Sequence, residues 1–338
     1  MSYQRYTLRA GSLANMRLRE FTLPEPAPGE VRVAVRSVGL NFADIYAIWG
    51  LYGATPKGDF TPGLEYAGVV EALGPGVTHL KPGDRIMGVT RFGGYTSHLN
   101  IDARYVIPLP PDWDFNTGAA YLVQTLTAYY ALKTLGVMES GHTVLIHSVA
   151  GGVGIQALKI AKSYGCTVIG TIGSPAKLDF ARQEGCDHVI VRGSDFEDQL
   201  RTALGERPLQ LVIDTVGGRY FSIPFKLLAP TGRLIVVGSS RYTSVGNRPN
   251  VFRLLYHFLT RPKIDPQQLP ETNKGVLGFN LIYLYERAPL MHQLLQELDG
   301  LRLAPPHVGH VLPFEKMHDA IKLFQSGKTV GKVVLELR

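Results

Sequence analysis

The hydrophobic pattern of the chain changes character about a third of the way along. Up to about Pro111, apolar and polar residues alternate, as from Val31 to Val35, and turn signals such as Pro62-Gly63 interrupt the alternation. This pattern predicts short β-strands with one buried face. From Thr143 to Val237, short apolar runs alternate with helical patterns instead. That alternation predicts an α/β fold with a parallel, doubly wound sheet.

Individual elements follow from the same pattern. A helix is expected from Thr117 to Thr134, leading into the parallel sheet. The five apolar runs that predict parallel strands are Val144 to Ile146, Thr167 to Ile172, His188 to Val191, Leu209 to Asp214 and Arg233 to Val237. Near the end of the chain, we expect helices at Leu290 to Leu298 and Lys316 to Phe324, then a final strand at Lys332 to Leu337.

The most informative segment is a glycine turn between the first parallel strand and its helix. The run ending at Ile146 is followed by Gly151, Gly152 and Gly154, and then by a helical pattern. Strand, glycine turn and helix form the opening unit of a dinucleotide-binding fold, in which backbone N–H groups approach a pyrophosphate. The spacing is a variant of the usual fingerprint, because Val149 stands where the first glycine is expected.

The end of the second parallel strand bears on cofactor choice. An NAD site would place Asp or Glu there for the ribose 2′-hydroxyl. This chain has Gly173 and Ser174, with Lys177 one turn later and Arg192 after the third strand. A hydroxyl and cations suit a 2′-phosphate, so NADPH is the favoured cofactor. The alternative is that Lys177 and Arg192 are ordinary solvated surface charges.

Composition limits the class of protein. A length of 338 residues favours two domains, and 45% hydrophobic with 19% charged residues is typical of a globular protein. The net charge is +7, but the sequence has no run of basic residues, which argues against nucleic-acid binding. The positive charge either helps to attract an anionic cofactor or reflects composition alone. Cys166 and Cys186 fit neither a disulfide framework nor a zinc site, and we expect a reducing, cytoplasmic location. The first twelve residues show neither an apolar core nor a cleavage signal, so we expect no signal peptide, and no run of the sequence approaches the length of a membrane span.

The segment from Gly238 to Pro289 breaks the strand–helix regularity. Its part from Val251 to Pro270 combines aromatic and leucine residues with three prolines. It suits a mobile lid, a dimer surface, a membrane-touching element or core packing. Core packing is favoured for its last part, Val276 to Leu284, which we predict to be a strand.

Several motifs together resemble the medium-chain dehydrogenase/reductase superfamily over essentially the whole chain. They are GLNFADIYAIWGLYG (Gly39 to Gly53), PGLEYAGVVEALGPGV (Pro62 to Val77), KPGDRIMG (Lys81 to Gly88), AGGVG (Ala150 to Gly154) and VGKVVLEL (Val330 to Leu337). NFAD and AGGVG are similar to the zinc-independent quinone oxidoreductase branch. VLGFNLIYL and PFEKMHDAI are most similar to its vesicle amine transport protein-like subgroup. The resemblance implies a GroES-like substrate domain, residues 1–120 and 290–338, around a Rossmann domain, residues 121–289.

The resemblance also predicts that the protein is metal-free. Zinc alcohol dehydrogenases have a cysteine ligand where Asn41 stands and a histidine ligand where Leu64 stands, and both replacements are poor zinc ligands. The pair His307 and His310 has no nearby thiol or carboxylate in the sequence. Without a metal to polarise an alcohol, hydride from NADPH is expected to reach an electron-poor acceptor, namely a quinone or an α,β-unsaturated carbonyl compound.

Site residues are carried over by position. For catalysis the resemblance implies Asn41, which can orient ring or substrate, and Tyr52, which is either a proton donor or a loop-packing residue, with Tyr46 as a weaker candidate. The implied cofactor contacts are Asn41, Thr127, Tyr130, Gly151, Gly152, Val153, Gly154, Ser174, Lys177, Arg192, Gly238, Ser239, Phe279 and Leu281. The family usually has tyrosine where Arg192 stands.

A second hypothesis comes from the vesicle-protein resemblance. It is a membrane- or partner-binding protein that binds NADPH without significant turnover, and the segment 251–270 is the feature that favours it. The superfamily also implies a homodimer, formed through edge strands near Arg233 to Val237 and Val276 to Leu284. The sequence leaves open the physiological acceptor, the oligomeric state and the role of segment 251–270.

Overall fold

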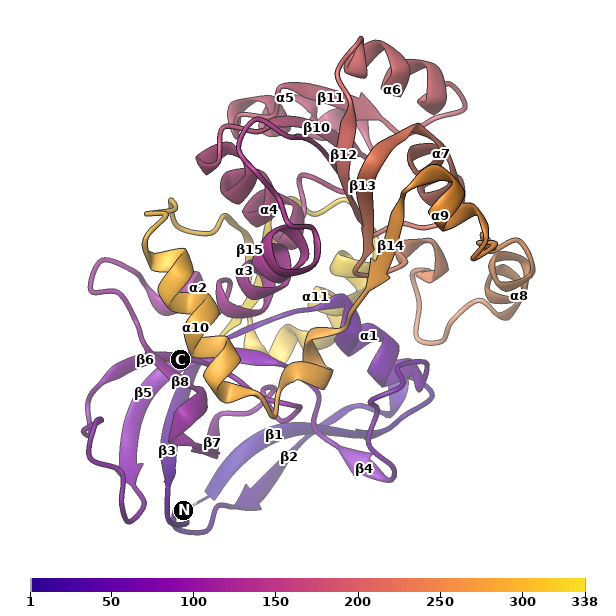
Figure 1. Ribbon diagram of the computed structural model, residues 1–338. Helices are drawn as coiled ribbons and strands as arrows, with labels where there is room; N and C mark the ends of the chain where they lie inside the picture. The colour runs from indigo at the N-terminus through magenta and orange to yellow at the C-terminus, as the bar shows by residue number, and fades with distance from the viewer. Residues whose placement is uncertain (1, 338) are drawn as a thin grey trace.

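The computed structural model describes residues 2–337 and contains two large sheets (Figure 1). One is a parallel sheet of six strands in the order β11-β10-β9-β12-β13-β14. The other has seven strands in the order β15-β16-β3-β5-β6-β8, with β7 also paired to β3. A smaller sheet, β2-β1-β4, flanks it. The predicted α/β class with a separate β-rich domain is confirmed.

The β-rich part joins both ends of the chain. Strand β16 pairs antiparallel with β3, placing Val334 opposite Gly39. Its strands are β1 (Ser2–Arg9), β2 (Arg17–Thr22), β3 (Glu30–Gly39), β4 (Asp59–Phe60), β5 (Glu65–Leu73), β6 (Arg85–Val89), β7 (His98–Asp102), β8 (Val106–Pro108), β15 (Val308–Pro313) and β16 (Lys332–Glu336). Its helices are α1 (Phe42–Trp49), α2 (Phe115–Gly118) and α11 (Met317–Gln325).

The parallel sheet lies between helices on its two faces (Figure 1). Its strands are β9 (Thr143–Ile146), β10 (Thr167–Ile172), β11 (His188–Val191), β12 (Leu209–Asp214), β13 (Leu228–Val236) and β14 (Gly275–Gly278). The helices of this part of the chain are α3 (Leu122–Tyr129), α4 (Gly152–Ser163), α5 (Leu178–Gln183), α6 (Phe196–Leu204), α7 (Arg219–Leu227), α8 (Val251–Leu259) and α9 (Gln268–Thr272). Helix α10 (Ala288–Asp299) lies away from the parallel sheet, beside the β-rich part (Figure 1). Strand order reverses at β9, and ligands of such sheets bind beyond the strand ends at the reversal.

Burial of apolar side chains explains why strand β9 and helix α4 form. Val144, Leu145 and Ile146 are fully buried, as expected of a central parallel strand. The helix that follows buries its apolar face, including Ala157 and Ile160. Cys166 and Cys186 are free, buried thiols.

Two predicted elements need correction. The expected helix at 117–134 is interrupted: α2 ends at Gly118, α3 begins at Leu122, and a π-helical turn follows from Tyr130 to Leu135. The predicted strand Val276 to Leu284 is wrong beyond Gly278, since Leu281–Leu284 is a 3-10 turn. The strand stops there because its partner β13 ends at Val236, which is opposite Gly278.

The assumed dimer edges also need correction. Segment Arg233 to Val236 belongs to β13, which pairs with β12 on one side and β14 on the other. It is therefore interior, and within residues 2–337 the edge of the sheet on this side is β14.

In the same part of the chain, no helix is long and apolar enough to cross a bilayer.

Candidate functional site

The glycine turn is shaped so that side chains are excluded. Gly151 caps the N-terminus of α4, and the turn is closed by a hydrogen bond from Gly151 N to Ser148 O (2.8 Å). A Cβ at Gly154 would collide with Ser148 O and lie 2.7 Å from Val149 Cα. A Cβ at Gly152 would lie 2.8 Å from Gln124 Cγ. Glycine is required at both positions for the backbone to pack this closely.

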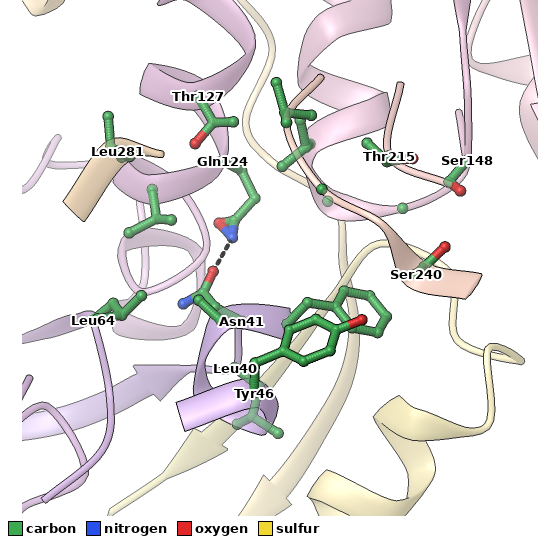
Figure 2. Close-up of a pocket in the computed structure, with 18 of the residues that line it drawn as sticks. Leu40, Asn41, Tyr46, Leu64, Gln124, Thr127, Ser148, Thr215, Ser240 and Leu281 are labelled. Carbon is green, nitrogen blue, oxygen red and sulfur yellow. Dashed lines mark hydrogen bonds between the residues drawn. The ribbon is translucent and has the colours of Figure 1, made fainter. Parts of the chain in front are cut away.

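A cavity of about 800 Å³ lies between the β-rich part and the parallel sheet, at the end of the sheet where the glycine turn stands. The structure brings most of the sequence-predicted site residues to its walls (Figure 2). They are Asn41, Tyr46, Tyr52, Thr127, Gly151, Gly152, Val153, Gly154, Lys177, Arg192, Gly238, Ser239, Phe279 and Leu281. Two do not line it: the Tyr130 ring packs on Phe279 at 4.8 Å, and Ser174 caps the turn before α5. Their role in binding stays a prediction.

The cavity has a positive wall. Among residues 2–337, its lining includes five Lys or Arg side chains and neither Asp nor Glu. Lys177 Nζ donates to the carbonyls of Gly327 and Thr329, both at 2.6 Å. Arg192 Nη1 donates to Thr171 Oγ1 (3.1 Å) and Ser148 Oγ (3.4 Å). Both cations are therefore held by the protein at the cavity, unlike freely solvated surface charges.

Burial lowers the pKa of Lys177, and the positive charge of Arg192 lowers it further. Burial likewise lowers the pKa of Arg192. Two partly desolvated cations without a carboxylate in the cavity wall favour a ligand that carries negative charge.

Asn41 stands at the floor of the cavity, across from Ser148 (Figure 2). Its Oδ1 accepts from Gln124 Nε2 (2.6 Å) and from Lys332 Nζ (3.0 Å). Its Nδ2 donates to Glu65 Oε1 (3.1 Å) and more weakly to Gly39 O (3.3 Å). Both ends of the amide are thus bound within the protein, and a ligand would meet an Asn41 side chain already fixed in orientation.

Two tyrosines cross the cavity from the β-rich part. Tyr46 OH on α1 donates to Ser239 O (2.9 Å) and also contacts Thr243 Oγ1 (2.9 Å). Tyr52 OH donates to Asn280 Oδ1 (2.6 Å). Burial raises the pKa of both phenols, that of Tyr52 strongly. Each is a neutral hydrogen-bond donor at physiological pH, able to protonate only a strong base such as an enolate carbon.

The sequence did not single out Gln124, Glu65 and Lys332 as site residues. Glu65 and Lys332 lie within the motifs PGLEYAG and VGKVVLEL, where a charge inside an apolar strand pattern is a usable signal of buried pairing. Gln124 has no comparable signal, because a single glutamine in a helical pattern suggests solvent exposure. Within residues 2–337, no group of three or more His, Cys, Asp or Glu side chains is placed to hold a metal ion.

A parallel sheet with a glycine turn, joined to a β-rich domain across a deep cavity, is the architecture of two-domain dehydrogenases and reductases. The sequence matches the family described as "Alcohol dehydrogenase GroES-like domain" over residues 27–111 and that described as "Zinc-binding dehydrogenase" over residues 152–268. The chain belongs to the medium-chain dehydrogenase/reductase superfamily and is an oxidoreductase of that family. The predicted Rossmann and GroES-like folds are confirmed with it.

The proteins similar to this chain include synaptic vesicle membrane proteins of the VAT-1 type and a quinone oxidoreductase. The human synaptic vesicle membrane protein VAT-1 homolog is 34% identical over 317 residues, which are 92% of this chain and 80% of that protein. The crystal structure of human VAT-1 homolog-like protein superposes with a TM-score of 0.86 at 26% identity, covering 100% of this chain and 99% of the other. Escherichia coli quinone oxidoreductase, solved with NADPH, gives 0.85 at 27% identity, covering 99% and 100%.

Proposed function

We propose that the protein is an NADPH-dependent, metal-free oxidoreductase that transfers hydride to quinones or α,β-unsaturated carbonyl compounds. The observation that carries this proposal is the acid-free cavity wall, with Lys177 and Arg192 held beside the glycine turn. The related quinone oxidoreductase of Escherichia coli was solved with NADPH, which supports the choice of cofactor.

The residues fit a dinucleotide phosphate at three places. The glycine turn packs closely on neighbouring protein atoms, since Cβ atoms at Gly152 and Gly154 would clash, and its backbone N–H groups at the N-terminus of α4 would bind the pyrophosphate. Lys177 and Arg192 would bind the 2′-phosphate. Gly238, Ser239, Phe279 and Leu281 would border the nicotinamide ribose and ring.

Metal-free chemistry is supported by the floor of the cavity. The ammonium group of Lys332 lies 3.0 Å from Asn41 Oδ1, so a second cation at Asn41 would be repelled. Leu64, at the other family ligand position, offers only an aliphatic side chain to the cavity. When bound, NADPH supplies the hydride. The protein's part is to hold an acceptor that is already electron-poor against it.

We assign the remaining roles to side chains at the floor of the cavity. Each phenol has one proton, so on acceptor binding Tyr52 and Tyr46 would turn it from Asn280 Oδ1 and Ser239 O toward the acceptor oxygen, where negative charge develops. With an enone, the Tyr52 phenol would protonate the enolate carbon, whereas a reduced quinone can take its protons from water. Apolar side chains, among them Leu64, Phe279 and Leu281, form the rest of the floor and exclude water from the acceptor.

The test is a thermal-shift titration with NADPH and NADH, followed by turnover assays with quinones, enones and simple alcohols. NADPH is expected to raise the melting temperature more than NADH, because a ligand that binds the folded state stabilises it by mass action. Quinones or enones should then oxidise NADPH, and alcohols should not reduce NADP⁺. NADPH that binds without turnover across the whole acceptor panel would contradict the proposed activity.

A second candidate function rests on helix α8, which lies at the periphery of the parallel-sheet domain (Figure 1). Its apolar side chains face solvent, and Phe252 is 84% exposed. Residues 245–264 also contain four Lys or Arg residues and neither Asp nor Glu. Exposed aromatic residues flanked by cations suit the surface of an anionic bilayer. This is the membrane-binding hypothesis, in which NADPH binds without significant turnover.

Vesicle sedimentation tests this candidate. The protein should sediment with phosphatidylcholine vesicles only when they contain phosphatidylserine, and Phe252→Glu with Leu255→Glu should abolish sedimentation. The control Val311→Glu changes an exposed apolar residue elsewhere and should sediment normally. If the double variant instead converts a dimer to a monomer, and wild-type protein ignores vesicles, α8 binds a second copy and the membrane candidate is refuted.

We also propose domain boundaries at residues 120/121 and 289/290, a cytoplasmic location, and a homodimer. The free edge of β14 supports the dimer, since an unpaired strand edge can extend a sheet across two copies. Sedimentation equilibrium measures the oligomeric state directly.

A further inference from the structure

At the floor of the cavity, the protein buries a full ion pair, of which Lys332 belongs to the lining. Lys332 Nζ lies 2.5 Å from Glu65 Oε1, and the two side chains are only 3% and 1% exposed. Replacing such a pair with apolar residues is often neutral or stabilising, because the loss of hydration offsets the attraction between the charges. Stability alone therefore gives no reason for this pair, and its position suggests another.

The backbone is arranged to admit the lysine. Lys332 reaches the floor from β16, and a Cβ at Gly39 would lie 2.7 Å from its Cε. The residue before it, Gly331, donates its N–H to Ala150 O at 2.9 Å, beside the glycine turn. The strand that carries Lys332 is thus bound directly to the proposed pyrophosphate turn.

The charges fix the orientation of two amides. Lys332 can only donate hydrogen bonds and ionised Glu65 can only accept them. Asn41 must therefore turn Oδ1 toward Lys332 (3.0 Å) and Nδ2 toward Glu65 (3.1 Å). Because Asn41 Oδ1 also faces Gln124, that residue must present its Nε2, which lies 2.6 Å away. The second oxygen of Glu65 accepts from Val123 N (3.1 Å), next to Gln124 on α3.

These two amides line the cavity at the end away from Arg192. Figure 2 shows Asn41 and Gln124 on the opposite side of the cavity from Ser148, the residue whose hydroxyl accepts from Arg192. We propose that Lys332 and Glu65 are positioning residues, which hold Asn41 and Gln124 in the orientation that places the nicotinamide end of NADPH. This inference rests on the proposed function, because it takes NADPH as the ligand.

The experiment separates positioning from stability. In the variant Glu65→Leu with Lys332→Met, the pair is replaced by apolar side chains, so the melting temperature should stay near that of the wild type. NADPH should bind about tenfold more weakly, the loss expected for one misplaced hydrogen bond to Gln124 Oε1, a buried acceptor without a partner among residues 2–337. Binding of 2′,5′-ADP, which carries the adenosine 2′-phosphate and lacks nicotinamide, should be unchanged.

Matched controls use similar groups away from the cavity. Lys159 and Glu184 form another Lys–Glu pair at 3.7 Å, and neither lines the cavity, so Lys159→Met with Glu184→Leu should leave NADPH binding intact. If the first double variant does not fold, Gln124→Met keeps the ion pair and should show the same selective loss. Its control is Gln156→Met, a buried glutamine on α4 outside the cavity wall.

Three outcomes decide the inference. A selective loss of NADPH affinity supports it. NADPH binding within twofold of wild type, or parallel loss of NADPH and 2′,5′-ADP, overturns it, because the pair would then be structural only. Failure of the wild-type protein to bind NADPH at all would refute the proposed function itself, and the wild-type titration reveals that case separately.

Discussion

At the scale of single residues, discrimination between the two coenzymes depends on Lys177 and Arg192. Both are bound to neighbouring protein groups and neither faces a carboxylate in the cavity wall. Charge-assisted hydrogen bonds to phosphate contribute about 1.5–3 kcal/mol each when well formed. We therefore expect Lys177→Ala with Arg192→Ala to weaken NADPH binding by at least about tenfold and NADH binding much less, as measured by fluorescence titration.

A matched control is Arg182→Ala, which removes an exposed cation of α5 that does not line the cavity. It should change neither affinity. Equal losses for NADPH and NADH in the double variant would show that Lys177 and Arg192 do not recognise the 2′-phosphate.

A second residue-scale prediction concerns Gly154. A methyl group at this position would overlap Ser148 O and crowd Val149 Cα at 2.7 Å, so the turn must shift. We expect Gly154→Ala to lower the free energy of unfolding by about 1–3 kcal/mol, as overpacking typically does, and to weaken NADPH binding. Gly300→Ala is the control, because its Cβ would meet ordinary contact at 3.5 Å from Glu297 O. Urea denaturation measures both, and an unchanged midpoint for Gly154→Ala would contradict the steric argument.

The same residues show what a sequence can reveal about a site. The glycines and Lys177 were predicted because each follows a predicted strand by only a few residues, in two successive strand–turn–helix units. The network of Lys332, Glu65 and Gln124 was not predicted, because its members are separated by 59 or more residues and meet only through the fold. Asn41 was identified by resemblance, but its fully bonded amide was visible only in the structure.

At the scale of elements, strand β9 is followed directly by a buried histidine, His147, that should make the fold acid-sensitive. His147 Nε2 donates to Tyr220 O (2.7 Å), so Nδ1 accepts from the Thr171 hydroxyl (2.9 Å). Burial lowers the pKa of His147 to about 3, and Arg192 contributes in the same direction. The folded protein therefore keeps this imidazole neutral where the unfolded chain protonates it.

The sign of the pH effect follows from that difference. Below about pH 6.5 the His147 imidazole is protonated in the unfolded chain but stays neutral in the folded protein. The free energy of unfolding therefore falls as the pH is lowered toward 3, by at most about 1.4 kcal/mol per pH unit. His147→Gln should flatten this dependence, whereas His79→Gln, at an exposed position, should preserve it. Urea midpoints between pH 7 and 5 test this, and parallel curves for wild type and His147→Gln would refute it.

Helices and strands could be predicted from the sequence where the hydrophobic periodicity of a segment agrees with the burial of its residues in the fold. The parallel strands from β9 to β12 have apolar runs whose pairing keeps them extended, and their predicted and observed bounds nearly coincide. Segment 276–284 was predicted as one strand because its apolar residues are continuous, yet only the part opposite β13 is extended. That boundary is set by pairing with the neighbouring strand β13. The sequence of the segment alone does not show where this pairing ends. Helix α8 likewise has an apolar sequence without a buried face.

At the scale of the whole molecule, the two domains are joined across the cavity by polar contacts. Tyr46 reaches Ser239, Tyr52 reaches Asn280, and Lys177 binds the loop at Gly327 and Thr329. A ligand that enters the cavity lies among all three contacts. Its binding therefore involves groups of both domains, and the charge of the whole molecule bears on it as well as local hydrogen bonds.

The net charge of +7 and the acid-free cavity wall predict a salt-dependent affinity. Raising NaCl from about 50 mM to about 500 mM shortens the Debye length from about 14 Å to about 4 Å and screens long-range attraction of an anion. NADPH binding should weaken about tenfold over this range, and NADH binding less, because NADH lacks the 2′-phosphate. Lys177→Ala with Arg192→Ala should make the two salt dependences similar. Fluorescence titrations at four salt concentrations give the slopes, and a NADPH affinity independent of salt would mean that only short-range contacts hold the cofactor.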